Sequence, residues 1–188
     1  LVLARQTGLM KIDIVRHGVS WIGLPAIARG ALPTAILRTG RNDWIGLSDG
    51  RVLALSRMRG EWREYRTGFG GEIRLANAGG SLLALSAQAA GGIDYFNESR
   101  MRFEHYFRLP EDLPVASLTF GLFRNAWYLG TDMGLFSIKR PGSGNMVWEM
   151  CGTREGLAKT SVHDMVSVRN DILLATSRVQ YPRIPSNV

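Results

Sequence analysis

A degenerate repeat runs along the chain and constrains its fold more than any other feature. Each copy has bulky apolar residues, then Gly or Ala, and in most copies a small hydroxyl residue. The copies are Val2-Leu3-Ala4-Arg5, Trp44-Ile45-Gly46-Leu47-Ser48, Leu83-Ala84-Leu85-Ser86, Tyr128-Leu129-Gly130-Thr131 and Leu173-Leu174-Ala175-Thr176. Their small residues, at positions 4, 46, 84, 130 and 175, are 42, 38, 46 and 45 positions apart. A period in this range is typical of β-propellers built from four-stranded blades.

The residues between the repeats divide into short apolar runs separated by turn signals. In the second unit, strands are predicted over Pro33–Thr39, 44–48 and Arg51–Ser56, and a more polar fourth strand follows Trp62. Asp49-Gly50 favours a hairpin turn, because both residues tolerate positive φ. The runs are 4–7 residues long and rich in Val, Ile, Leu, Trp and Tyr, which favours strands over helices. We therefore predict an all-β propeller or partial propeller, with antiparallel blades of about 40–45 residues.

The 188 residues are interpreted as one propeller domain or a fragment of one. The first and last units are incomplete, which leaves open a closed four-bladed ring or a piece of a larger propeller. We favour the larger propeller, because residues 2–5 would duplicate a second strand that the C-terminal unit already supplies. The stretch 98–107 fits helical and strand spacing about equally, and the repeat assigns it to an outer strand. The predicted parts are a part-blade at 1–24, blades at about 33–66, 71–108 and 115–150, a part-blade at 162–176 and a tail at 177–188.

Composition excludes several classes of protein. No apolar run approaches the ~18 residues that a membrane-spanning helix needs. Cys151 is the single cysteine, so neither an intrachain disulfide nor a cysteine-based zinc site can form. The formal net charge is +7, from 23 basic and 16 acidic residues, so this is a basic protein. An arginine-rich surface can bind nucleic acid or acidic partners, but the arginines are spread along the chain, which favours codon bias as their origin.

Catalytic signatures are missing from the sequence. The histidines at 17, 105 and 163 lack the short spacings of a metal site. No Gly-x-Ser-x-Gly motif marks a hydrolase nucleophile. We therefore predict no catalytic residue, no cofactor and no metal site, and we expect that the chain is not an enzyme.

One segment combines arginines with aromatic residues and is a candidate binding surface. Such interleaving can stack on and neutralise a nucleic acid. Glu61 and Glu64 in the same segment oppose that interpretation, and a charged outer strand of a blade is the alternative, so nucleic acid is not the expected partner. The candidate surface comprises Arg57, Arg59, Trp62, Arg63, Tyr65 and Arg66.

A second set of residues recurs at related positions of different units and is predicted to pack blades together. It comprises Trp44, Gly46, Trp127, Gly130, Gly134 and Trp148. Glycine inside a strand usually marks a close approach of two segments. We therefore predict that Gly130→Leu is more damaging than Gly142→Leu, because Gly142 lies in an expected exposed hairpin loop.

The segment 127–136 (WYLGTDMGLF) resembles the repeat of the two-component-regulator propeller family, and 156–166 resembles the upstream part of the same pattern. Trp44–Gly50 is a weaker match. The resemblance implies structural residues and transfers no site residue. It implies a non-enzymatic interaction or scaffold module in a larger protein or assembly, partnered by other proteins or by the remainder of a propeller. The alternative it implies is an extracytoplasmic ligand-sensing domain of a signalling protein, which would bind a small molecule or glycan.

Overall fold

The computed structural model describes ten segments of the chain. They are residues 2–4, 8–13, 15–78, 80–87, 91–109, 118–123, 126–139, 147–151, 160–168 and 171–177. The chain divides into two compact units, Leu1–Pro114 and Val115–Val188. The two units are described separately below.

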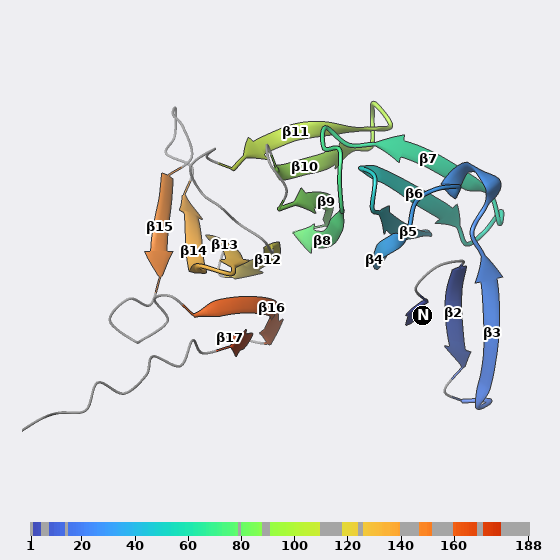
Figure 1. Cartoon of the computed structure of the whole chain (residues 1–188), viewed down its shortest axis with the longest axis horizontal. Coiled ribbons are helices and arrows are strands. Elements are labelled where there is room, and N and C mark those ends of the chain that lie inside the picture. Colours follow the sequence, from blue (N-terminus) through green and yellow to red (C-terminus); the bar gives the residue numbers. More distant parts are fainter. Residues whose placement is uncertain are drawn as a thin grey trace, which may run out of the picture. The chain divides into compact units, whose positions relative to one another are not determined.

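Unit 1 contains three antiparallel sheets that follow one another along the chain (Figure 1). Sheet A comprises β1 (Val2–Ala4), β2 (Gly8–Asp13) and β3 (Gly18–Gly23). A short 3-10 turn over Ala26–Ala28 leads into sheet B. Sheet B comprises β4 (Pro33–Thr39), β5 (Asn42–Leu47), β6 (Arg51–Ser56) and β7 (Trp62–Arg66). Sheet C comprises β8 (Arg74–Ala78), β9 (Ser81–Ser86), β10 (Gly92–Asn97) and β11 (Arg102–Arg108).

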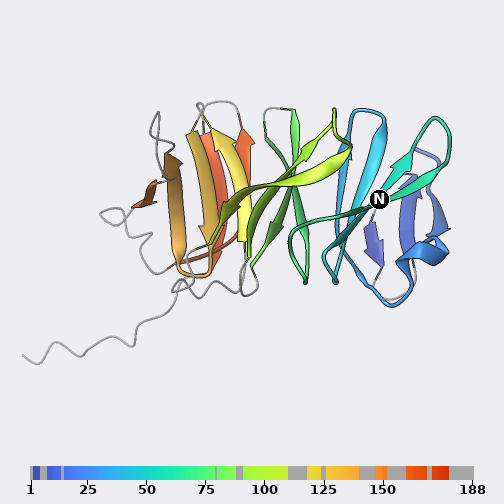
Figure 2. The same cartoon turned by 90° about the horizontal axis from the view of Figure 1, so that it is seen from above.

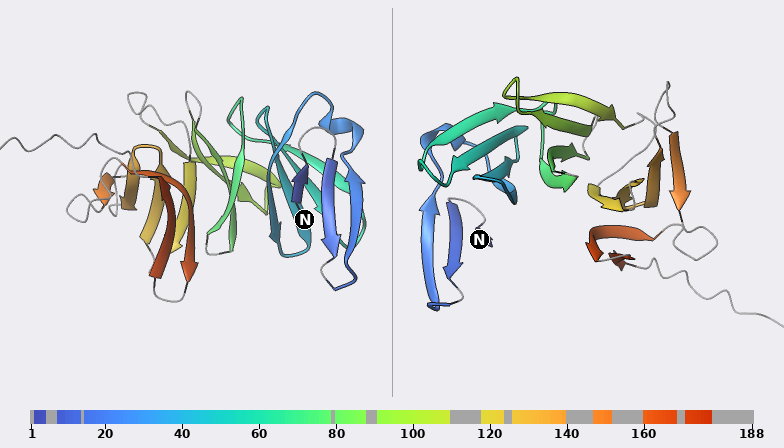
Figure 3. Two further views of the ribbon diagram at one scale, coloured as in Figure 1. Left: turned by 60° about the horizontal axis from the view of Figure 1, so that its bottom comes forward. Right: turned by 180° about the vertical axis from the view of Figure 1, so that it is seen from behind.

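Unit 2 contains two sheets, D and E, and β16 of sheet E lies beside β12 and β13 of sheet D (Figure 3). Sheet D comprises β12 (Leu118–Phe123), β13 (Ala126–Thr131), β14 (Gly134–Lys139) and β15 (Val147–Cys151). Sheet E comprises β16 (Ser161–Val168) and β17 (Asp171–Ser177).

The predicted fold class is confirmed. Sheets B, C and D each have four antiparallel strands, paired in the order of the chain. Figure 2 shows the same sheets from above. The ambiguous stretch 98–107 contains most of β11, which pairs with β10 across a β-bulge, so its assignment to an outer strand is correct. The described residues contain no helix that is long and apolar enough to span a membrane.

Sheet B shows how the residues of one repeat are arranged on the two faces of a blade. The Asp49-Gly50 turn joins β5 to β6, and Gly50 has a φ of 86°, which glycine adopts without steric cost. Strand alternation then places side chains on two faces. The forward face, defined as the one turned to the next sheet along the chain, carries Trp44, Val52, Ala54 and Tyr65. The rear face, turned to the preceding sheet, carries Ile45, Leu47, Leu53 and Trp62.

Both faces of sheet B are buried in apolar clusters. The forward face packs with Phe69, Ile73, Leu82, Ala84, Phe96 and Phe103, which come from sheet C and the chain that leads into it. The rear face packs with Leu9 and Ile22 of sheet A and with Ala28 and Ala31 of the connection. Full burial of one such aliphatic side chain contributes roughly 1.5–3 kcal/mol, so sheet packing stabilises unit 1 on both sides of sheet B. In unit 2, Leu135 of sheet D packs with Val162 and Met165 of sheet E.

Candidate functional site

The candidate surface between Arg57 and Arg66 is divided between the two faces of sheet B. Trp62 pairs with Leu55, and Arg63 pairs with Ala54, across β6 and β7. Because successive strand residues point to opposite faces, Arg63 and Tyr65 lie on the forward face. Trp62, Glu64 and Arg66 lie on the rear face.

The rear-face members and Arg57 have other partners. Trp62 packs against the apolar cluster between sheets A and B. The exposed Arg66 lies 3.7 Å from the half-buried Glu64, and an ion pair this close to solvent contributes little to stability. The Arg57 guanidinium donates a hydrogen bond to the carbonyl oxygen of Gly40. These contacts separate Arg57, Trp62 and Arg66 from the remaining members of the set.

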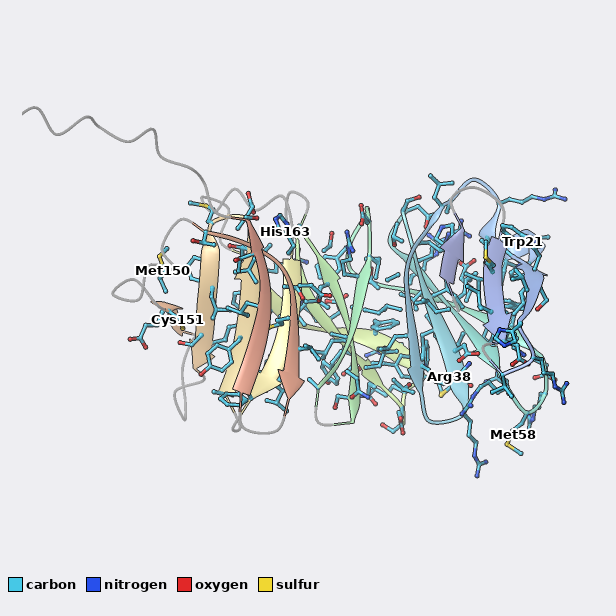
Figure 4. All side chains as sticks on the ribbon, turned by 90° about the horizontal axis from the view of Figure 1, so that it is seen from below. Trp21, Arg38, Met58, Met150, Cys151 and His163 are labelled. Atoms are coloured by element: carbon cyan, nitrogen blue, oxygen red, sulfur yellow. The ribbon has the colours of Figure 1, made fainter. Side chains whose placement is uncertain are left out.

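Arg59, Arg63 and Tyr65 line one pocket of about 400 Å³ on sheet B. Ala54, Ser56 and Tyr65 are buried or half-buried and form its floor, whereas the charged lining residues are exposed at its rim. Figure 4 shows Met58, another lining residue, at the end of sheet B that carries the β6–β7 turn. The full lining is Arg41, Asn42, Ala54, Ser56, Met58, Arg59, Glu61, Arg63 and Tyr65.

Backbone contacts fix the two turns that form the rim. The amide of Arg57 donates to the carbonyl oxygen of Arg41 at 2.9 Å, which joins the β6–β7 turn to the β4–β5 turn. The amide of Ser56 donates to the carbonyl oxygen of Glu61 at 2.9 Å and closes the β6–β7 turn. On the floor, the Tyr65 ring packs against Trp44 and Phe96, with ring centroids 5.6 and 5.0 Å away. The pocket is therefore built on ordered turns and a packed aromatic residue.

The pocket carries an excess of positive charge. Three arginines line it and Glu61 is its one carboxylate. Arg38, also on sheet B, forms an ion pair with Asp43. Arg51 of the same sheet forms ion pairs with Asp49 and Glu64. Within the described segments, Arg41, Arg59 and Arg63 form no such ion pair. Guanidinium groups of this kind bind carboxylate, sulfate and phosphate with two parallel hydrogen bonds.

Sheet C holds a buried polar contact that the sequence did not single out. Asp94 on β10 is 1% exposed. Its carboxylate accepts a hydrogen bond of 2.6 Å from the amide of Gly68 and lies 3.2 Å from Nδ1 of His105. The contact ties the chain that links sheets B and C to the middle of sheet C. A lone Asp within the apolar run GIDYF was the available signal. Among the described residues, no cluster of three or more His, Cys, Asp or Glu side chains could hold a metal ion.

The residues predicted to pack blades lie in both units. Trp44 is buried, and its Nε1 donates to Oγ1 of Thr39 at 2.8 Å. Trp127 of β13 meets Phe120 edge-to-face, with centroids 5.2 Å apart. Gly134 opens β14 and pairs with Thr131, and Trp148 pairs with Ile138 across β14 and β15.

Gly46 and Gly130 lie where a larger residue would meet another segment. A Cβ on Gly46 would be 2.6 Å from the carbonyl oxygen of Ile73, which precedes sheet C. A Cβ on Gly130 would be 2.6 Å from a methyl group of Thr119 and from a methyl group of Val162 in sheet E. Gly142, with which Gly130 was compared, lies outside the described residues.

One comparison with a solved structure agrees with the propeller architecture. Neither a family model nor a curated protein sequence matches the chain. Among solved structures, a catalytically inactive virginiamycin B lyase of Staphylococcus aureus, crystallised with quinupristin, matches with a TM-score of 0.67 and 15% identity. The match covers 89% of this chain and 56% of the lyase chain, so this chain spans about half the length of the lyase. An extracellular domain of a hybrid two-component system from B. thetaiotaomicron matches with a TM-score of 0.44 and 14% identity, over 90% of this chain and 30% of that one.

The lyase match contradicts the prediction that the chain is not an enzyme, because the shared fold is one on which an enzyme is built. A missing short motif was a weak basis for that prediction, since a site on a propeller is assembled from several blades and need not leave a local signature. At 15% identity the likeness shows the fold, and it transfers neither a reaction nor a site residue.

Proposed function

We propose that this chain is a ligand-binding propeller domain and that the pocket of sheet B is its binding site. The observation that carries the proposal is the gathering of Arg41, Arg59 and Arg63 over a floor that includes Tyr65. The ligand class that fits is a small molecule or glycan bearing carboxylate or sulfate groups. The arginines would bind the anionic groups, and Tyr65 and Met58 would contact the apolar face of a sugar ring.

The pocket favours ligand sensing over a scaffold role, because a scaffold would not need a concave charged site. Together with the resemblance of 127–136 to the two-component-regulator repeat, it supports a sensor domain of a signalling protein, placed outside the cytoplasm. Glu61 at the rim would repel ligands of high negative charge density, which favours isolated carboxylates or sulfates over a continuous polyphosphate backbone.

Calorimetric titration of the 188-residue protein with three probes tests the proposal. The probes are an oligogalacturonate, a sulfated oligosaccharide and a neutral maltooligosaccharide. We expect saturable binding of at least one anionic probe and none of the neutral probe, with affinity that falls as salt is raised, because exposed ion pairs are screened. The double variant Arg59→Gln/Arg63→Gln should weaken binding by about tenfold or more, which corresponds to about 1.4 kcal/mol.

Arg66→Gln is the matched control, because Arg66 follows Arg63 on β7 but lies on the opposite face. We expect its affinity to stay within about twofold of the unmodified protein, as for a surface charge outside the site. Equal binding of neutral and anionic probes would refute the proposal. So would a loss in Arg66→Gln of about half or more of the binding free energy lost in Arg59→Gln/Arg63→Gln, since binding would then follow only the number of positive charges removed.

A further inference from the structure

The rear face of sheet A is an exposed apolar surface. Met10 pairs with Trp21 and Ile12 pairs with Val19 across β2 and β3, so the four side chains lie together on one face. Leu9 and Ile22, which alternate with them, pack against sheet B on the other face. Trp21 is 62% exposed, Val19 60% and Ile12 42%. Single exposed apolar residues are common, but a cross-strand group of four marks a surface that something covers. Figure 4 shows Trp21 on sheet A.

The same face of the next two sheets is covered by the sheet that precedes it. The rear face of sheet B packs against sheet A. The rear face of sheet C carries Asp94 and Phe96, and Phe96 meets Trp44 and Tyr65 of sheet B edge-on, with ring centroids 4.9 and 5.0 Å apart. Sheet A thus exposes to solvent the face that, in sheets B and C, is packed against the preceding sheet.

The edge strand of sheet A likewise corresponds to a strand that is covered by a neighbour in sheet C. Sheet A has three strands with β1 at its edge, whereas sheet C has β8 paired along β9. Residues 1–4 (LVLA) match 81–84 (SLLA), the start of β9. In sheet C, Leu75 of β8 pairs with Ala84. By this correspondence, β1 offers to a further strand the edge that β9 offers to β8.

We propose that the rear face of sheet A, comprising Met10, Ile12, Val19 and Trp21, is a blade-docking surface. Its occupant is a further four-stranded blade of the same propeller, which covers it with an apolar forward face like that of sheet B. The inference is independent of the anion-binding pocket, which is formed by sheet B alone. Close packing of two such sheets would remove the four side chains from water, and this hydrophobic burial supplies the driving force.

The experiment supplies that blade from the chain's own sequence. A copy of residues 33–80, which holds sheet B, the link to sheet C and β8, is fused before Leu1. The copied β8 is then linked to β1 by a copy of residues 79 and 80, which link β8 to β9 in the sequence, and the copied sheet B precedes sheet A. Val19→Cys, in a Cys151→Ser background, reports exposure of the face through its rate of alkylation. Met58→Cys in the same background is the control, because Met58 is 73% exposed and lies outside the face.

We expect alkylation of Cys at position 19 to slow by about tenfold in the extended protein, as burial in a close-packed interface requires. The control thiol in the original sheet B should react at about the same rate in both proteins, within about twofold. An unchanged rate at position 19 in a cooperatively folded extended protein would overturn the proposal.

A second measurement does not depend on folding of the extended protein. In the 188-residue chain the face is open, so Val19→Glu/Trp21→Glu should shift the urea midpoint by no more than about 0.3 M, as for a surface substitution. A larger loss would mean that the face belongs to the core of this chain and would overturn the proposal. A stable dimer of the unmodified chain that these substitutions dissociate would assign the face to a second copy, and would equally overturn it.

Discussion

Two glycines show how a single residue controls the spacing of adjacent sheets. We expect Gly46→Ala to destabilise more than Gly130→Ala. The new Cβ of Gly46→Ala meets the backbone carbonyl of Ile73, whereas that of Gly130→Ala meets side-chain methyl groups of Thr119 and Val162, which shift more easily than the backbone of a neighbouring sheet. Overpacking of this kind costs typically about 1–3 kcal/mol, and urea unfolding measures it.

Gly23→Ala is the control for these variants. Gly23 also lies in a strand, but a Cβ there would have no heavy atom within 4 Å. Its free energy of unfolding should change by less than about 0.5 kcal/mol. If Gly23→Ala proves as destabilising as Gly46→Ala, close approach of the sheets is not the cause of the loss, because replacing glycine by alanine lowers the entropy of the unfolded chain and by itself favours folding.

At the scale of the element, the outer hairpin of sheet C carries a polar cluster centred on Glu104. The Glu104 carboxylate accepts hydrogen bonds from the Tyr95 hydroxyl at 2.7 Å, from the Asn97 amide at 3.1 Å and from the guanidinium of Arg100 at 2.9 Å. These donors, Tyr95 first, lower the pKa of Glu104 to about 2. The same contact raises the pKa of Tyr95, because the neutral hydroxyl donates to the carboxylate.

The depressed pKa of Glu104 predicts a pH dependence of stability with a definite sign. An unfolded Glu has a pKa of about 4.3. The carboxylate therefore stabilises the fold fully above that pH, and its contribution is lost as the pH falls toward about 2, where the folded state also binds the proton. We expect the unmodified protein to melt at a higher temperature than Glu104→Gln at pH 6, and the difference to shrink as the pH approaches 2. A difference that stays constant over this range would exclude the ionised cluster as its cause.

At the scale of the whole molecule, the three apolar clusters described above each draw their residues from one unit. Two clusters lie within Leu1–Pro114 and the third within Val115–Val188. Val162→Ala should therefore loosen the packing of sheet D with sheet E by about 2 kcal/mol and speed hydrogen exchange most in β12 to β17. Leu53→Ala, at a cost of about 2–5 kcal/mol, should speed exchange most in β2 to β11. The largest acceleration in the unit that does not carry the substitution would contradict this assignment of the clusters.

The sequence alone determined the blade architecture, because turn residues and apolar runs are local signals that recur at a fixed period. Pro33–Thr39 and Arg51–Ser56 are strands with the predicted bounds. It also singled out Arg59, Arg63 and Tyr65, which line the candidate pocket, but it grouped them with Arg57, Trp62 and Arg66, which do not.

Only the tertiary structure decided which face each residue occupies and what it meets there. Arg63 lines the pocket and Arg66 does not. Successive residues of a strand point to opposite faces, so two residues an odd number of positions apart lie on different faces of the sheet. Gly46 faces sheet C, whereas Ala84, which the repeat aligned with it, lies opposite Asp94 on the face turned back to sheet B. Arg41 joins the site from a turn 18 positions before Arg59. These positions depend on pairing between segments that are distant in the sequence, and the period of the repeat does not specify that pairing.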